Sequence, residues 1–243
     1  MVDKLHQAQE KQQVIDSYND IFNSSDRLQE MPSYYTWVLK HLCAKKGGRL
    51  LDVATGLGSV LVDSEKMGIE PVGIDISITA IRRLKKSDPD SRALLGDGEA
   101  LPFPDKSFNY VTNLGSLEHF LDPAKGLREI SRILKDDGLA AIFVPNSYYL
   151  VDIIRNVLFK GYGPTHDQPI ERFATKNEWG DLIKENGLQI NKIYPYNFLF
   201  PKNKTDWNFI KHKPKKVIAA MFSFLIPVNL AYSFLYICRK RNL

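Results

Sequence analysis

The amino-acid sequence of 243 residues predicts an α/β fold, doubly wound around a mostly parallel sheet. Between about residues 49 and 145, short apolar runs typical of buried strands alternate with segments of helical periodicity. Such alternation produces parallel strands that are joined by right-handed crossovers. In addition, Asp52, Asp75, Asp97 and Asn113 each stand at the carboxyl end of a predicted strand. Sheets of this kind bind their ligands at that edge.

The first strand, at Arg49–Leu51, follows an N-terminal helix over about residues 4–22, and its own helix opens at Ser59. The elements that follow are a strand at Glu70–Asp75, a helix from the N-cap Ser77 to about Lys86, a strand at Ala93–Asp97, a strand at Tyr110–Asn113, a helix from the N-cap Asp122 and Pro123 to about Lys135, a turn at Gly138, and a fully apolar strand at Leu139–Val144.

The stretch Leu50–Ser59 is the centre of this arrangement. The strand and Asp52 lead into a turn of small residues, Ala54-Thr55-Gly56-Leu57-Gly58. A strand, a glycine turn and a helix form a nucleotide site, because glycine lets a ligand approach the backbone closely. Asp75 lies 19 residues after Gly56, which is about the offset at which a carboxylate meets a ribose hydroxyl.

The same turn indicates which nucleotide binds. A dinucleotide fingerprint would need a third glycine at Leu61, and a phosphate-binding loop would need a lysine that the turn lacks. Asp52 at the entrance repels phosphate and suits a cation. An adenosine with a ribose, without phosphate and with a positively charged amino-acid tail meets these conditions. That ligand is S-adenosylmethionine.

The motif Asp52-Val53-Ala54-Thr55-Gly56-Leu57-Gly58 resembles the acidic-x-Gly-x-Gly-x-Gly motif of class I S-adenosylmethionine-dependent methyltransferases, in their small-molecule branch, with Ala54 in place of the first glycine. The resemblance runs from about Leu50 to Pro145. It implies a Rossmann-like, seven-stranded sheet with an antiparallel last strand and helical lid segments. It also implies S-adenosylmethionine as cofactor and S-adenosylhomocysteine as product. No spacing in the sequence suggests a metal site.

Motif and resemblance together assign the cofactor-binding residues. These are Tyr18, Asp52, Ala54, Thr55, Gly56, Gly58, Asp75, Ile76, Asp97, Gly98, Glu99, Asn113, Leu114 and Gly115. By resemblance Asp97 accepts from the adenine amino group; the alternative is that it only caps a turn. The pair Tyr34-Tyr35 is a further candidate for contact with cofactor or substrate, unless these rings serve packing alone.

The resemblance also divides the single domain. Residues 1–45 are expected to form a helical lid (or simply to cover a sheet edge), 46–145 the cofactor-binding core, and 146–174 an acceptor-site insert. Residues 175–243 then supply the C-terminal helices and the last two strands. Their expected elements are a helix opened by the capping box at Thr175–Glu178 and ended at Gly187, a strand at Leu188–Phe200, a helix at Val217–Phe224, and the last strand at Ala231–Cys238.

Two histidines are candidate general bases for a hydroxyl acceptor. His119 lies in the loop that follows the fourth strand, and His166 lies in the insert. Either could instead be a packing residue. The expected reaction is methyl transfer to a metabolite, sugar or lipid-linked intermediate, with O-methylation favoured. The alternatives are an RNA methyltransferase that uses the basic tail, and a non-catalytic cofactor-binding partner subunit.

Charge and cysteine content bear on partners and location. From Pro201 onward nine Lys or Arg accompany one acid, whereas residues 1–200 hold 24 basic and 27 acidic residues. This balance argues against nucleic acid as a partner. The basic tail is either a solvated loop that joins the last two strands or a site of weak contact with an anionic membrane. The uncharged run Val217–Cys238 could cross a bilayer, but the polar break at its centre and the need for a last strand favour a folded segment. A polar N-terminus and two cysteines, Cys43 and Cys238, suggest a cytoplasmic location. With the Val217–Cys238 run folded into the sheet, a monomer or homodimer is expected.

Overall fold

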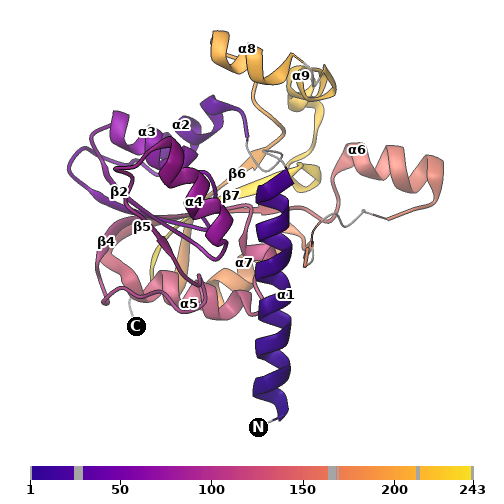
Figure 1. Cartoon of the computed structure of the whole chain (residues 1–243). Helices are drawn as coiled ribbons and strands as arrows, with labels where there is room; N and C mark the ends of the chain where they lie inside the picture. The colour runs from indigo at the N-terminus through magenta and orange to yellow at the C-terminus, as the bar shows by residue number, and fades with distance from the viewer. Residues whose placement is uncertain (1, 25–29, 164–167, 169, 212–213, 242–243) are drawn as a thin grey trace.

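The computed structural model describes residues 2–24, 30–163, 168, 170–211 and 214–241 of the chain. It confirms the predicted doubly wound fold: a seven-stranded sheet runs in the order β3-β2-β1-β4-β5-β7-β6 (Figure 1). Only β7 runs antiparallel to its neighbours β5 and β6. The strands are β1 Arg49–Val53, β2 Glu70–Asp75, β3 Ala93–Leu95, β4 Phe108–Leu114, β5 Leu134–Pro145, β6 Leu188–Tyr196 and β7 Ser233–Lys240.

Helices cover both faces of this sheet. They are α1 Val2–Ser24, α2 Pro32–His41, α3 Ser59–Lys66, α4 Ile78–Ser87, α5 Pro123–Ile133, α6 Leu150–Asp152, α7 Lys176–Glu185, α8 Lys204–Ile210 and α9 Pro214–Met221. Adjacent strand residues point to opposite layers: Leu50 packs in the layer under α2 and α3, whereas Leu51 packs in the layer under α5 and α7. This alternation follows from the two-residue period of a strand.

Local signals confirm several predicted helix ends. The hydroxyl of Ser77 accepts from Ala80 N–H, and the carboxylate of Asp122 accepts from Lys125 N–H. At α7, the Thr175 hydroxyl accepts from Glu178 N–H, and the Glu178 carboxylate accepts from Thr175 N–H, which is the predicted capping box.

The turn predicted at Gly138 is wrong, because β5 already begins at Leu134, directly after α5. Leu134 is fully buried and pairs with Phe108, and the register then shifts between Phe108 and Tyr110. Gly138 lies within the strand, where an added Cβ would come within 2.9 Å of Asn109 O. A close backbone approach, and not a turn, therefore requires this glycine.

The predicted ends of the last two strands also need correction. Strand β6 stops at Tyr196 and not at Phe200, because Phe198 adopts a left-handed conformation with φ of 65°. Strand β7 lies two residues further along than predicted, at Ser233–Lys240. The apolar run is divided among α9, the 3-10 turns Ser223–Leu225 and Val228–Leu230, and β7. In the described part of the chain, no helix combines the length and the apolar character that a bilayer crossing needs.

Leu127 gives a direct test of the layer beneath α5. Its side chain is fully buried in the main core, whereas Leu158 is 71% exposed. Leu127→Ala should lower the free energy of unfolding by about 3 kcal/mol, because it removes packed methyl groups and leaves a cavity. The matched change Leu158→Ala should alter it by less than about 0.5 kcal/mol. Urea unfolding measures both, and equal effects would contradict this packing.

Candidate active site

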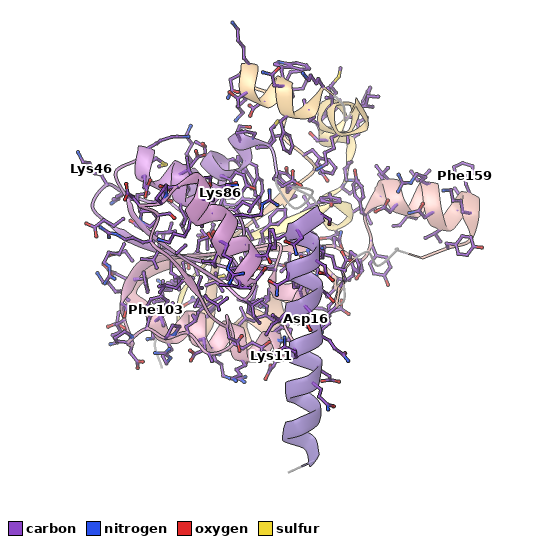
Figure 2. The ribbon with its side chains drawn as sticks, viewed as in Figure 1. Lys11, Asp16, Lys46, Lys86, Phe103 and Phe159 are labelled. Carbon is purple, nitrogen blue, oxygen red and sulfur yellow. The ribbon has the colours of Figure 1, made fainter. Side chains whose placement is uncertain are left out.

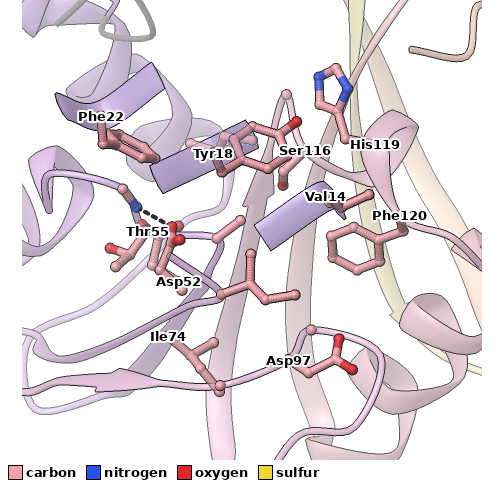
Figure 3. A pocket seen from close by; sticks show the side chains of 18 of the residues that line it. Val14, Tyr18, Phe22, Asp52, Thr55, Ile74, Asp97, Ser116, His119 and Phe120 are labelled. Atoms are coloured by element: carbon pink, nitrogen blue, oxygen red, sulfur yellow. Dashed lines mark hydrogen bonds between the residues drawn. The ribbon is translucent and has the colours of Figure 1, made fainter. Parts of the chain in front are cut away.

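A pocket lies at the carboxyl ends of the central strands, with α1 across its mouth (Figure 3). It brings together most of the residues that the sequence assigned to the cofactor. The assigned residues that line it are Tyr18, Asp52, Ala54, Thr55, Gly56, Asp75, Ile76, Asp97, Gly98, Glu99, Leu114 and Gly115. Of the two candidate bases, His119 also lines the pocket, whereas His166 lies outside the described residues.

Two assigned residues do not line the pocket. Gly58 has φ of 77°, and a Cβ there would come within 2.6 Å of Leu84, so this glycine shapes the turn and its packing on α4. Asn113 is fully buried at the end of β4. Neither atom of its side-chain amide has a hydrogen-bond partner among the described residues.

The glycine turn is held in a left-handed conformation. Ala54, Gly56 and Gly58 all have positive φ, of 62°, 54° and 77°. A left-handed backbone costs a residue with a side chain about 1 kcal/mol, which is the physical reason why the family motif has glycine where this chain has Ala54. The turn therefore carries local strain that its surroundings must offset.

Asp75 supplies part of that support. Its Oδ2 accepts the Gly56 N–H at 2.7 Å, and its Oδ1 accepts the Ser77 N–H at 2.8 Å. The carboxylate thus connects the glycine turn to the start of α4. Burial raises the pKa of Asp75 to about 6, although these backbone hydrogen bonds act in the opposite direction.

Asp52 is the second buried acid of the pocket, with only 3% of its surface exposed. The Thr112 hydroxyl donates to Asp52 Oδ1 at 2.6 Å. Burial nevertheless raises the pKa of Asp52 to about 7. A cation beside this carboxyl would favour its charged form, so the site suits a positively charged ligand group.

Asp97 and Glu99 form the opposite end of the pocket. Asp97 Oδ1 accepts the Glu99 N–H at 2.8 Å, so Asp97 caps its own turn while it also lines the pocket. Lys11 of α1 donates to the Asp97 carboxylate and to Glu99 Oε2, the latter at 3.2 Å. Glu99 Oε1 accepts the Leu121 N–H at 2.8 Å, which joins this end to the loop that carries His119.

Helix α1 closes the pocket from above, as Val14, Tyr18 and Phe22 show in Figure 3. Asn19 Oδ1 accepts from the Ser77 hydroxyl at 2.7 Å, and the Tyr18 hydroxyl donates to Gln168 Oε1 at 3.0 Å. The N-terminal helix is therefore bound both to the cofactor core and to the insert.

His119 faces this enclosed space and is 6% exposed. Its Nδ1 contacts the Ile170 carbonyl oxygen. Because a carbonyl only accepts, Nδ1 carries the hydrogen, and Nε2 keeps a free lone pair. Burial lowers the pKa of His119 below its usual value of 6.5, with the Ile170 hydrogen bond acting against that shift. A neutral imidazole with a free Nε2 can accept a proton.

Glu118 lies beside this imidazole, with Oε1 3.8 Å from His119 Nε2. The carboxyl is buried, and burial raises its pKa to about 8, so it is mostly protonated at neutral pH. Within the described residues its Oε2 has no hydrogen-bond partner. A gap of 3.8 Å is too long for a direct hydrogen bond, and Glu118 is not among the residues that line the pocket.

Sequence reasoning missed several residues of the wall. The wall also contains Lys11, Val14, Phe22, Leu57, Ser59, Val60, Ile74, Gly96, Ser116, Phe120, Leu121 and Gln168. Val14, Phe22 and Lys11 lie on the helical face of Tyr18, so the α1 periodicity could have indicated them. Of the candidate pair Tyr34-Tyr35, Tyr35 lines the pocket, whereas Tyr34 is a core residue. No motif or periodicity in the sequence indicated Gln168. No cluster of His, Cys, Asp or Glu within the described ranges could hold a metal ion.

Comparison with known proteins agrees with this geometry. Residues 51–142 match the family model of the methyltransferase domain. A demethylmenaquinone methyltransferase of Chlorobaculum tepidum is 29% identical over 177 residues, which cover 65% of this chain and 73% of that protein. The ubiquinone/menaquinone biosynthesis C-methyltransferase UbiE of Geotalea uraniireducens is 33% identical over 152 residues, covering 57% of this chain and 65% of that protein.

Solved structures share the fold. A methyltransferase in complex with the Trm112 activator of Haloferax volcanii superimposes with a TM-score of 0.69 at 18% identity, covering 95% of this chain and 98% of that one. The YcgJ protein of Bacillus subtilis gives a TM-score of 0.58 at 20% identity, covering 87% and 99%. The matched domain and the strand order of the sheet together show that this chain is a class I S-adenosylmethionine-dependent methyltransferase.

Proposed function

We propose that the protein methylates a small molecule with an ionisable hydroxyl group, and that His119 removes the proton of that hydroxyl. One observation carries the proposal: His119 lines a pocket closed by α1, and its neutral imidazole, with Nδ1–H directed to Ile170 O, keeps Nε2 free to accept a proton. An acceptor hydroxyl becomes a better nucleophile when it loses its proton.

The residues of the pocket fit S-adenosylmethionine. In this proposal Asp75, at the end of β2, binds ribose hydroxyls and the Asp97–Glu99 segment binds the adenine edge; both line the pocket, which supports these roles. The raised pKa of Asp52, about 7, marks a carboxyl that a cationic methionine part would stabilise in its charged form. When bound, the cofactor supplies an electrophilic methyl group on a positively charged sulfur.

The protein's own contribution is position and proton transfer. His119 Nε2 takes the proton of the acceptor hydroxyl. Tyr18, Val14 and Phe22 of α1 exclude water above the site (Figure 3). These groups hold the acceptor in line with the methyl group, so that binding supplies the orientation which the displacement needs.

We further propose that the acceptor is a hydroquinone ring and that carbon receives the methyl group. Proton loss from a phenolic hydroxyl makes both its oxygen and the neighbouring ring carbon nucleophilic, so His119 serves either outcome. After transfer to carbon, the hydrogen of that carbon leaves as a proton and the phenolic oxygen regains one, which restores the aromatic ring. The expectation of O-methylation finds no support in the comparisons. Relatives named for demethylmenaquinone and for C-methylation support the carbon alternative.

The proposal extends to the state of the protein in the cell. We propose a monomer or homodimer in the cytoplasm, with weak contact between its basic C-terminal region and anionic membrane lipid. Nine Lys or Arg against the single acid Asp206 from Pro201 onward support that contact.

Acceptor identity can be tested with labelled S-adenosylmethionine and demethylmenaquinone reduced by borohydride. The expected result is transfer of one methyl group to a ring carbon, read by mass spectrometry and NMR. Unreduced demethylmenaquinone is the matched control; it has no hydroxyl to deprotonate and should remain unmethylated. Methylation at oxygen would overturn the carbon proposal, and no transfer would overturn the hydroquinone acceptor.

Asp75→Ala tests the cofactor site. The change should weaken binding of S-adenosylmethionine and S-adenosylhomocysteine by roughly 1.5–3 kcal/mol, because it removes a charged hydrogen-bond acceptor. Asp75→Asn keeps one acceptor oxygen and should lose less. Glu65→Ala, at an exposed position of α3, is the control and should change nothing. Calorimetry that finds unchanged affinity for Asp75→Ala would exclude the ribose role.

His119→Ala should lower turnover about 10²-fold, with little change in affinity for S-adenosylhomocysteine. Because the pKa of His119 is lowered from 6.5, the wild-type enzyme should keep its activity at neutral pH and lose it only as the pH falls below 6.5. His41→Ala is the control, since His41 also contacts a backbone carbonyl, that of Trp37, but lies away from the pocket. Full turnover in His119→Ala would move the base elsewhere.

A further inference from the structure

The acceptor-site insert forms a projecting lobe with an apolar surface. Helix α6 continues as a π-helical segment, Ile153–Leu158, and neither part contains a buried residue. Figure 2 shows Phe159 at the far end of this projection. We name residues 150–163 the insert lobe. Its exposed large apolar side chains are Val151, Ile154, Val157, Leu158, Phe159 and Tyr162, with Phe159 76% exposed.

A second projection stands nearby. We name the described residues of 200–230 the C-terminal lobe, which comprises α8, α9 and two 3-10 turns (Figure 1). Its exposed large apolar side chains are Phe200, Trp207, Ile218, Met221, Phe222, Phe224, Leu225 and Val228, with Phe224 78% exposed. Apolar side chains gathered in this way commonly mark an interaction site.

Both lobes arise from one corner of the molecule. The side-chain amide of Asn146, just before the insert lobe, donates to Asn229 O at 2.9 Å and to Ala231 O at 2.8 Å. The rings of Tyr149 and Tyr232 then pack edge to face, with centroids 5.2 Å apart. The two apolar surfaces are therefore fixed to each other at their base.

The positive charge of the C-terminal lobe indicates which kind of partner can bind its apolar surface. Its single acid, Asp206, is fully buried and accepts the N–H groups of Ser33 and Lys202 at 3.1 and 2.9 Å. Lys202, Lys204 and Lys211 are exposed around it. Two copies of the chain meeting through this lobe would bring lysines together without an accessible acid of the lobe to pair with them, which opposes self-association.

We propose that the insert lobe and the C-terminal lobe together form a docking surface for an anionic phospholipid bilayer. Lysines attract the acidic headgroups, while Phe159, Leu158, Phe224 and Leu225 enter the interfacial layer. The insert also carries Gln168 and Ile170, which contact Tyr18 and His119 at the pocket. Resting on the proposed function, this surface would deliver an apolar hydroquinone from the membrane to the site.

Co-sedimentation of the full chain with vesicles tests the surface. The probes are vesicles of phosphatidylglycerol mixed with phosphatidylcholine, and vesicles of phosphatidylcholine alone, at low and high salt. Wild-type protein should bind the acidic vesicles at low salt and lose most of that binding at high salt. Changing Lys202, Lys204 and Lys211 to Ala should weaken it by about 100-fold, which is about fivefold for each lysine near the surface.

The double change Phe159→Glu and Phe224→Glu should weaken vesicle binding at least about tenfold. Leu94→Glu, at a 45% exposed leucine of the edge strand β3, is the matched control and should keep wild-type binding. Affinity for S-adenosylhomocysteine, measured by calorimetry, should stay the same in all these variants and shows that each is folded.

Three results would overturn the proposal: no binding of wild-type protein to acidic vesicles at low salt, undiminished binding of the double variant, or a dimer in sedimentation that the double variant abolishes. None of these measurements uses a methyl acceptor. Failure of the hydroquinone assay with intact vesicle binding would therefore count against the proposed acceptor, and the reverse result would count against the docking surface.

Discussion

The carboxylate of Asp75 is the constraint on which the site depends. It accepts from Gly56 and Ser77, and so it holds a turn whose residues Ala54, Gly56 and Gly58 are all in left-handed conformations. A turn of this kind is stable only where its surroundings determine it. Asp75 comes from β2, next to β1 in the sheet, so the parallel pairing of these two strands is what places the carboxylate against the turn.

Three carboxyl groups near this end of the sheet are buried, which disfavours their charged forms. Burial raises the pKa of Asp52, Asp75 and Glu118 to about 7, 6 and 8, from ordinary values of 3.8, 3.8 and 4.5. The folded state thus binds these three protons more tightly than the unfolded chain, and the contribution of these three carboxyls to stability declines as the pH rises from about 4 to about 8. Burial of these carboxyls therefore costs stability. In return, Asp52 can become charged beside a cationic ligand, and Glu118 stays neutral.

The segment around Gln168 and Ile170 connects the pocket to the exposed insert lobe. Ile170 sets the tautomer of His119, Gln168 holds Tyr18 of the roof, and the residues just before this segment form the insert lobe. Arg172 strengthens the connection, since its guanidinium donates to the carbonyls of Phe120 and Leu121. The segment that contacts His119 and Tyr18 and the exposed apolar surface therefore belong to one stretch of the sequence, whereas Asp52 and Asp75 belong to strands of the sheet.

Local patterns in the sequence were sufficient for the parallel core. Strand and helix periodicity, the N-caps at Ser77 and Asp122 and the capping box at Thr175 depend on neighbouring residues, and the structure confirms them. Asp52, Asp75 and Asp97 could be placed together because parallel strands end at one edge. The bulged start of β5 could not be predicted, since Gly138 is required by the close approach of Asn109 O on another strand. Lys11 and Gln168 reach the pocket through contacts that span 86 and 150 residues. Only the tertiary structure decides such contacts, because no local pattern encodes which distant side chains the folded core brings together.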